Sequence, residues 1–352
     1  MIKFILTASF LVSSVLAGPK SAWKGFSDPE IMASGFTHKL GALPLQAMIE
    51  MGPKAWSGHY WPSSEGGINV RWNHPLKEGF KYKSPTKEQV LNMSLDELAQ
   101  LAPSEKYDLF LGNYDYPMRK DAEGTANPRA EDWAGICNGW APAALHHNEP
   151  LPKVMTNPDG IQIPFGSSDI KALLSWYYAF RAEHNGTHQV GLRCFFGRWM
   201  GGARGCDEDL NAGAFHIVTS NMIGIKKQGF VADVDRFKEV WNQPIVGYKS
   251  AVVDQNLKPS PKAALKTVRE VRVKTELFYL DESDNVTWGP VHGTREQMVS
   301  KRDLQYRLEL NAENEIIGGE WESDERPDFL WNIEKNEKWD GLLSALPLLL
   351  ND

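Results

Sequence analysis

The chain has 352 residues, of which 42% are hydrophobic and 24% are charged, a balance that is ordinary for a globular protein with a substantial core. Its formal net charge of −7 excludes a general nucleic-acid binder, because such proteins carry a basic surface. The 13 tryptophans predict buried aromatic cores and an aromatic-lined cleft, but they identify no ligand.

The first 17 residues are predicted to be a secretory signal peptide. Lys3 provides the positive start, residues 4–16 form an apolar run, and small residues precede a cleavage site before Gly18. The run is shorter than the roughly 20 apolar residues of a membrane helix, and no later segment approaches that length. We therefore expect an exported protein, extracellular or periplasmic, whose mature form has no membrane partner.

Helical signals dominate the first half of the remaining chain. Residues 18–110 are predicted to form an N-terminal subdomain of loops and short strands, with helical pieces from Ser84. Residues 117–132 are polar and predict a long surface loop. The clearest helix begins at Ser167, where apolar residues recur at helical spacing. Residues 111–352 are predicted to be the catalytic region.

Strand signals dominate the second half. AGAFHIVTSNMIGI, from Ala212, and GFVADVD, from Gly229, are predicted to be short strands joined by a turn. VREVRVKTELFYL, from Val268, alternates apolar and polar residues, and DLQYRLELNAENEIIGGEW, from Asp303, predicts a hairpin. Helices followed by antiparallel strands predict an α+β fold with a helical N-terminal part and a mostly antiparallel β C-terminal part.

The three cysteines leave one unpaired if the other two form a disulfide. Cys194 and Cys206 flank a Gly-rich segment that could bring them together, and an exported protein permits the bond. Pairing of Cys137 with either of the others is not excluded by spacing. We expect the 194–206 bond, which leaves Cys137 as a free thiol.

Cys137 lies in GICNGWAPAALHH, where apolar residues share one helical face: Cys137, Trp140, Ala141, Ala144 and Leu145. Asn138 is predicted to cap the helix, and Pro142 requires the helix to begin close to the thiol or to be distorted. A thiol at a helix N-terminus meets free N–H groups, which favour a thiolate and can hold an oxyanion. The alternative is a small structural core residue.

A cysteine nucleophile needs a base and a group that orients it. His216 lies on a predicted strand downstream of Cys137, and Asp233 follows on the next strand. Asp235 shares a strand face with Asp233, and Asn242 is a third choice for the orienting residue. Cysteine on a helix, then histidine and an acid on strands, is the order of papain-type enzymes, so the sequence predicts a papain-like cysteine-enzyme core.

Two acidic segments, residues 207–209 and 281–285, are the places where a cation could bind. Neither matches an EF-hand loop, and the histidines show no zinc spacing. We therefore predict no metal site and no required cofactor, with calcium left as an open alternative.

The segment VWNQPIVGYK resembles the VWNQP peptide of the oomycete cell-wall transglutaminase elicitor family, which has bacterial relatives. The residues concerned include Val240, Trp241, Asn242, Gln243, Pro244 and Lys249. Four further segments are similar to that family in the same order: SGHYWPSSEGGINVRW, SEKYDLFLG, GICNGWAPAA and IIGGEWESDERPDFLW. The resemblance spans residues 56–331. The peptide differs from the oomycete form in Ile245 and Val246 after the proline and in Tyr248 before the lysine.

The resemblance implies a protein-glutamine γ-glutamyltransferase in which Cys137 forms a thioester with a protein glutamine. A lysine amine then forms an isopeptide bond, or water gives deamidation, so the expected partners are proteins bearing Gln and Lys. The N–H groups of Cys137 and Asn138 would hold the oxyanion, with Trp133 as the nearest indole donor. The alternatives are a papain-like cysteine peptidase and a non-enzymatic cell-wall or surface binding protein.

The disulfide pairing can be tested by mass mapping of the mature protein under non-reducing conditions. We expect a peptide in which Cys194 is linked to Cys206 and a Cys137 thiol that reacts with an alkylating agent after denaturation. A bridge that includes Cys137 would contradict its predicted role as a nucleophile.

Overall fold

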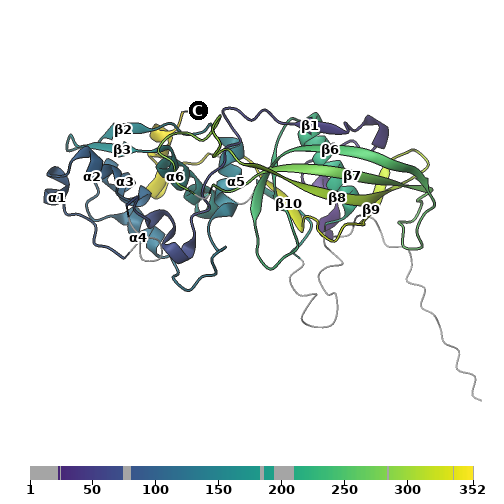
Figure 1. Cartoon of the computed structure of the whole chain (residues 1–352), viewed down its shortest axis with the longest axis horizontal. Helices are drawn as coiled ribbons and strands as arrows, with labels where there is room; N and C mark the ends of the chain where they lie inside the picture. The colour runs from purple at the N-terminus through teal and green to yellow at the C-terminus, as the bar shows by residue number, and fades with distance from the viewer. Residues whose placement is uncertain are drawn as a thin grey trace, which may run out of the picture.

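The computed structural model describes residues 23, 25–73, 81–182, 186–193, 210–283, 285–335 and 337–351. A helical half and a sheet half lie side by side along the long axis, and helix α5 (Cys137–His146) lies where they meet (Figure 1). This arrangement confirms a mixed fold of helices and antiparallel strands. The predicted signal peptide lies outside the described residues.

The helical half contains short helices and one hairpin. Its elements are α1 (Lys87–Leu91), α2 (Leu95–Ala99), α3 (Pro103–Phe110), α4 (Pro117–Glu123), α6 (Ser167–Phe180), and the paired strands β2 (Lys153–Thr156) and β3 (Gln162–Phe165). The predicted helix from Ser167 is confirmed. The prediction of a loop over residues 117–132 is wrong at its start, because Pro117 begins α4, and proline suits the first position of a helix. The predicted boundary near residue 110 falls at the end of α3, and helices of the same half continue to Phe180.

The sheet half is built on one antiparallel sheet, in which β1 pairs with β6 beside the path β4-β10-β5-β6-β7-β8-β9. Its strands are β1 (Gln46–Met48), β4 (Thr187–Val190), β5 (Phe230–Asp233), β6 (Asn242–Leu257), β7 (Arg269–Leu280), β8 (Val299–Leu310), β9 (Ile316–Trp321) and β10 (Phe329–Ile333). The predicted strands from Gly229 and Val268 and the predicted hairpin from Asp303 are confirmed.

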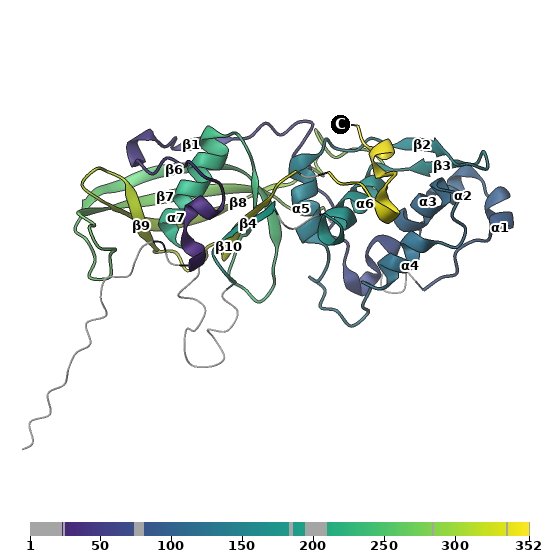
Figure 2. The same ribbon diagram turned by 180° about the vertical axis from the view of Figure 1, so that it is seen from behind.

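The segment predicted as a strand from Ala212 is instead helix α7 (Ala212–Thr219), which continues as a π-helical turn to Ile225. The Asn211 side chain caps it by accepting hydrogen bonds from the N–H groups of Gly213 and Ala214. A continuous apolar run does not distinguish a buried strand from a buried helix, and every residue of α7 is buried. Figure 2 shows α7 against one face of the sheet.

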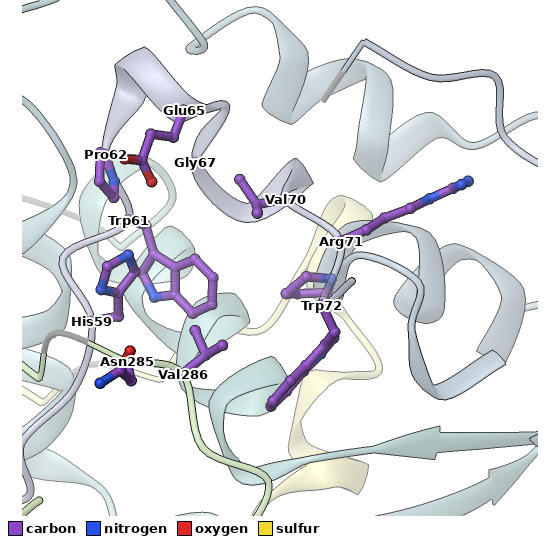
Figure 3. A pocket seen from close by; sticks show the side chains of 11 residues that line it. His59, Trp61, Pro62, Glu65, Gly67, Val70, Arg71, Trp72, Asn285 and Val286 are labelled. Carbon is purple, nitrogen blue, oxygen red and sulfur yellow. The ribbon is translucent and has the colours of Figure 1, made fainter. Parts of the chain in front are cut away.

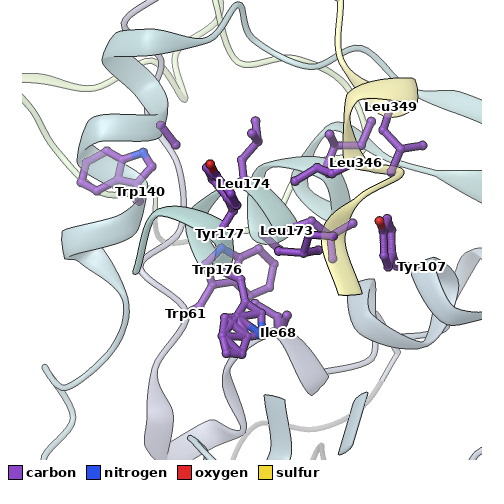
Figure 4. Close-up of a cluster of buried hydrophobic side chains, with 14 of the residues drawn as sticks. Trp61, Ile68, Tyr107, Trp140, Leu173, Leu174, Trp176, Tyr177, Leu346 and Leu349 are labelled. Atoms are coloured by element: carbon purple, nitrogen blue, oxygen red, sulfur yellow. The ribbon is translucent and has the colours of Figure 1, made fainter. Parts of the chain in front are cut away.

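Each half has its own hydrophobic core. In the helical half, Trp140 on α5 packs with α6, and the C-terminal segment returns to place Leu346 and Leu349 beside Tyr107 (Figure 4). The second core lies between α7 and the sheet. Among the described residues, no helix has the length and apolar character needed to cross a bilayer.

A buried ion pair ties four distant segments together next to α5. Lys171 on α6 donates to the Glu149 carboxylate, with 2.5 Å between Nζ and Oε1, and also to the Ser57 carbonyl oxygen at 3.1 Å. The same carboxylate accepts hydrogen bonds from the backbone N–H groups of Val291 and His292. The pair therefore fixes the segments around residues 57 and 291 relative to α6.

Removing one partner of this pair leaves a buried charge without compensation, which typically costs about 3–5 kcal/mol. We expect Lys171→Met to lower the free energy of unfolding by about that amount in urea denaturation. The matched control is Lys87→Met, because the exposed pair of Lys87 with Asp159 is worth about 0–1 kcal/mol. Equal losses in the two variants would contradict the structural role of Lys171.

Candidate active site

Cys137 is the first residue of α5, and its side chain is 5% exposed. It is a free thiol whose Sγ lies 3.6 Å from the Val240 carbonyl oxygen, to which it donates, and 3.5 Å from Nδ2 of Asn242, from which it accepts. Burial raises the pKa of the thiol to about 11, although the hydrogen bonds from Asn242 oppose the shift. The resting side chain is therefore a protonated thiol.

The helix begins at the thiol, as Pro142 required, but its capping differs from the prediction. Ile136 occupies the cap position without a side-chain hydrogen bond, and its carbonyl oxygen accepts from the N–H groups of Gly139 and Trp140. Asn138 is instead the exposed second residue of the helix, so its prediction as the cap is wrong. The N–H groups of Cys137 and Asn138 lie in the first turn of α5, where the backbone N–H groups of a helix lack intrahelical partners.

Asn242 is held in a fixed orientation beside the thiol. Its Oδ1 accepts a hydrogen bond from the Trp331 indole at 2.8 Å, which directs Nδ2 towards Cys137. Asn242 also pairs in register with Asp233 across strands β5 and β6. The structure therefore brings together three of the residues that the sequence singled out.

Two acids, the buried Asp233 and the partly buried Glu282, have pKa values raised by desolvation to about 8. Both raise the pKa of the Cys137 thiol electrostatically, so both lie within reach of its charge. Gln243 donates to Oε2 of Glu282 at 2.8 Å, and the Trp241 N–H donates to Asp233. Each acid keeps one carboxyl oxygen that has no hydrogen-bond partner among the described residues.

Comparison with known proteins relates this chain to a family of transglutaminases. Residues 118–340 match the transglutaminase elicitor family. The chain belongs to this family. Its fold is similar to that in the crystal structure of the GP42 transglutaminase from Phytophthora sojae, with a TM-score of 0.68 and 23% sequence identity over 91% of this chain and 94% of that chain. A search of curated proteins finds no match.

The segment of this transglutaminase elicitor family member that resembles the VWNQP peptide forms one side of the site. Val240 and Trp241 precede strand β6, which begins at Asn242. The residues from Asn242 to Tyr248 are buried, and Lys249 is exposed. Val240 and Asn242 both hydrogen-bond with the thiol. The family peptide is therefore an internal part of the site.

His216 does not reach Cys137 in this family member. It lies on helix α7, in the core of the sheet half, whereas Cys137 belongs to the core of the helical half. Its Nδ1 lies 2.8 Å from the Tyr306 hydroxyl, and burial lowers its pKa to about 4. The prediction that His216 is the base on a strand beside the thiol is therefore wrong. The apolar run around His216 forms a buried helix, α7, and not a strand.

Two other predicted residues also point elsewhere. The Trp133 indole donates to Glu131, two residues before it, rather than towards the thiol. Asp235 accepts from the Phe237 N–H and pairs with Arg302 at 3.5 Å. Cys194, Cys206 and the acidic segment 207–209 lie outside the described residues. Within the described part of the chain, no group of three or more His, Cys, Asp or Glu side chains is placed to hold a metal ion.

Sequence reasoning missed the loop from Gly58 to Trp61, which runs beside the thiol. The Tyr60 carbonyl oxygen accepts from the N–H of Ile136 at 2.8 Å, and its ring packs edge-on against Trp241. Gly135 permits this approach, since an added Cβ would lie 2.4 Å from the Tyr60 oxygen. The loop has no periodicity, so the one signal that could have found it is its place in the family-like segment SGHYWP.

The raised pKa of Glu282 makes stability depend on pH. The folded state keeps the proton up to about pH 8, whereas the unfolded state loses it near its ordinary value of about 4.3. The folded state therefore binds more protons between these values, and the free energy of unfolding falls as pH rises through this window.

We expect Glu282→Gln, which can still accept the hydrogen bond from Gln243, to flatten this fall in urea denaturation measured from pH 4.5 to pH 8.5. The variant gains stability relative to wild type as pH rises. Glu313→Gln, at an exposed position, is the control and should follow the wild-type curve. A Glu282→Gln curve parallel to wild type would show that this carboxyl is not held protonated.

Proposed function

We propose that the protein is a transglutaminase that forms a Cys137 thioester with a protein-bound glutamine and transfers the acyl group to lysine or another amine, or to water. The observation that carries the proposal is the free thiol at the start of α5, which contacts Asn242 of the family peptide segment. Membership of the transglutaminase elicitor family supports the same chemistry.

The first step is attack of the sulfur on the glutamine carboxamide. The thiol proton passes to Glu282 in the minor fraction of molecules in which this carboxyl is ionised near neutral pH, because its pKa is about 8, and its Oε1 has no hydrogen-bond partner among the described residues. The C–S bond forms, the C–N bond breaks, and ammonia leaves with the proton from Glu282. Asp233, which shares the raised pKa, is the second acid of the site.

The developing oxyanion needs donors that are already in place. The N–H groups of Cys137 and Asn138 at the start of α5 take this role, and Nδ2 of Asn242 is available once the sulfur is acylated. The cysteine at the start of a helix beside antiparallel strands supports the proposal of a papain-like core, although His216 does not belong to the site. In this proposal, region 111–352 carries the nucleophile, and the subdomain 18–110 contributes the loop around Tyr60.

The apolar start of the chain supports export of the enzyme, so its substrates are extracellular or periplasmic proteins that present Gln and Lys. The chemistry uses side chains of this chain alone, and no cofactor takes part in it. Measurement of activity with and without a chelator of divalent ions tests the calcium alternative directly.

The function is tested by incorporation of a fluorescent primary amine into casein. We expect Cys137→Ser to lose at least about 10³-fold in rate, as expected when a nucleophile is removed, with the circular dichroism spectrum unchanged. The control is Ala141→Ser on the same buried face of α5, which adds a hydroxyl without removing the thiol and should keep most activity.

Other results would replace the proposal. Casein cleavage without amine incorporation would identify a cysteine peptidase, because the acyl group would then pass to water from a cleaved main chain. Unchanged amine incorporation in Cys137→Ser would show that Cys137 is not the nucleophile, and a wild type that neither incorporates amine nor cleaves casein would fit a surface binding protein.

A further inference from the structure

A cavity of about 170 Å³ is lined mainly by residues from His59 to Trp72 and by Asn285 and Val286, and Cys137 is not part of its lining. Figure 3 shows the rings of Trp61 and Trp72 on opposite sides of this space, with Val70 and Val286 between them. Glu65 lines the cavity on the side of Trp61. The space has two indole walls, aliphatic surfaces between them, and a carboxylate at the rim.

The two segments that form most of this cavity adjoin Tyr60 and Glu282, which lie close enough to Cys137 to interact with it electrostatically. The Gly58 carbonyl oxygen accepts from the Ser283 N–H at 3.0 Å, and Nδ1 of His59 lies 3.1 Å from the Ser283 carbonyl oxygen. The first segment continues to Tyr60, whose pKa is raised by burial, by Glu65 and, more weakly, by Cys137.

The walls are held rigidly in place. The Trp72 indole donates to Oδ1 of Asp169 at 2.9 Å, and the other oxygen of that buried carboxylate accepts from Lys106 at 2.7 Å. Trp61 has a φ of 53°, a left-handed conformation that is rare for a bulky residue and is often found at functional sites. The cavity is thus a preformed feature and not a loosely packed gap.

The chemistry of the lining selects a cation on an apolar stem. Indole faces attract ammonium groups, and the Glu65 carboxylate adds negative charge. Arg71 also lines the cavity, but its guanidinium is neutralised by Glu105 through two hydrogen bonds of 2.8 Å and covers the Tyr82 ring. A lysine side chain, with four methylene groups and a terminal ammonium, matches this combination.

Trp61 adds evidence for a peptide rather than a free amine. Its side chain is 4% exposed, and its indole N–H has no hydrogen-bond partner among the described residues. A buried donor without an acceptor is costly. Because this N–H is covered in the structure, the indole would have to shift before a carbonyl oxygen of an incoming peptide could satisfy it.

We propose that this cavity is the acceptor subsite, which binds the side chain of a protein-bound lysine and delivers its amine to the Cys137 thioester. The proposal rests on the transglutaminase function above. The lysine nitrogen forms the new C–N bond, the C–S bond breaks, and the proton lost by the nitrogen returns to the sulfur through Glu282. Atoms and charges balance without another reactant.

Two assays separate the subsite from the chemistry. Ammonia release from a glutamine peptide without added amine measures formation and hydrolysis of the thioester. Crosslinking of that peptide to a single-lysine peptide, or to cadaverine, measures use of the acceptor. Both assays are carried out on the full mature protein.

Three variants test the cavity. Val286→Trp fills it and should lower kcat/KM for both amines by about tenfold or more, with Val268→Trp at an exposed position as the control. Glu65→Gln should raise KM for both amines about fivefold.

Trp61→Phe keeps an aromatic wall but removes the N–H. It should lower kcat/KM for the lysine peptide about fivefold, with a smaller effect on cadaverine, which has no carbonyl group.

Ammonia release should stay within about twofold of wild type in Glu65→Gln and Trp61→Phe. If ammonia release falls as much as crosslinking, the cavity binds the glutamine substrate and the proposal is wrong. Unchanged kinetics for both amines in all three variants would also overturn it. Absence of ammonia release from the wild type would instead refute the thioester chemistry, and the subsite with it.

Discussion

The buried Glu149 carboxylate is the constraint on which the arrangement of the site depends. It binds Lys171 of α6 and two backbone N–H groups near residue 291, and Lys171 also holds the carbonyl of Ser57. Loops that are far apart in the sequence thereby become neighbours of α5. Without this anchor, neither the loop around Tyr60 nor the turn that carries Glu282 would have a defined position beside the thiol.

Burial sets the electrostatic state of the empty site. The thiol and the two nearby acids all have raised pKa values, so each favours its neutral form near pH 7. Three negative charges close together in a region of low dielectric would repel strongly. Most molecules therefore hold these protons near pH 7, and in the proposed reaction the minor fraction with an ionised Glu282 is the form that takes the thiol proton.

The sequence predicted those parts of the site that lie on elements with a clear local pattern. Cys137 was placed at the start of a helix because Pro142 permits no earlier beginning, and Asp233 was placed on a strand by its alternation. His216 was misplaced because an uninterrupted apolar run suits a buried helix as well as a strand. Tyr60 and Glu282 were missed because they lie in loops, whose conformation depends on contacts with distant segments.

The family peptide has a consequence beyond catalysis, because most of it is hidden. Strand β6 lies between β5, β7 and β1, and the side chains from Asn242 to Tyr248 are buried in the folded protein. A receptor or antibody that reads this stretch as a linear epitope would meet it only after the chain is unfolded or cut. Asn242, which contacts the Cys137 thiol, is thus hidden, in the folded protein, from any partner that recognises an extended chain.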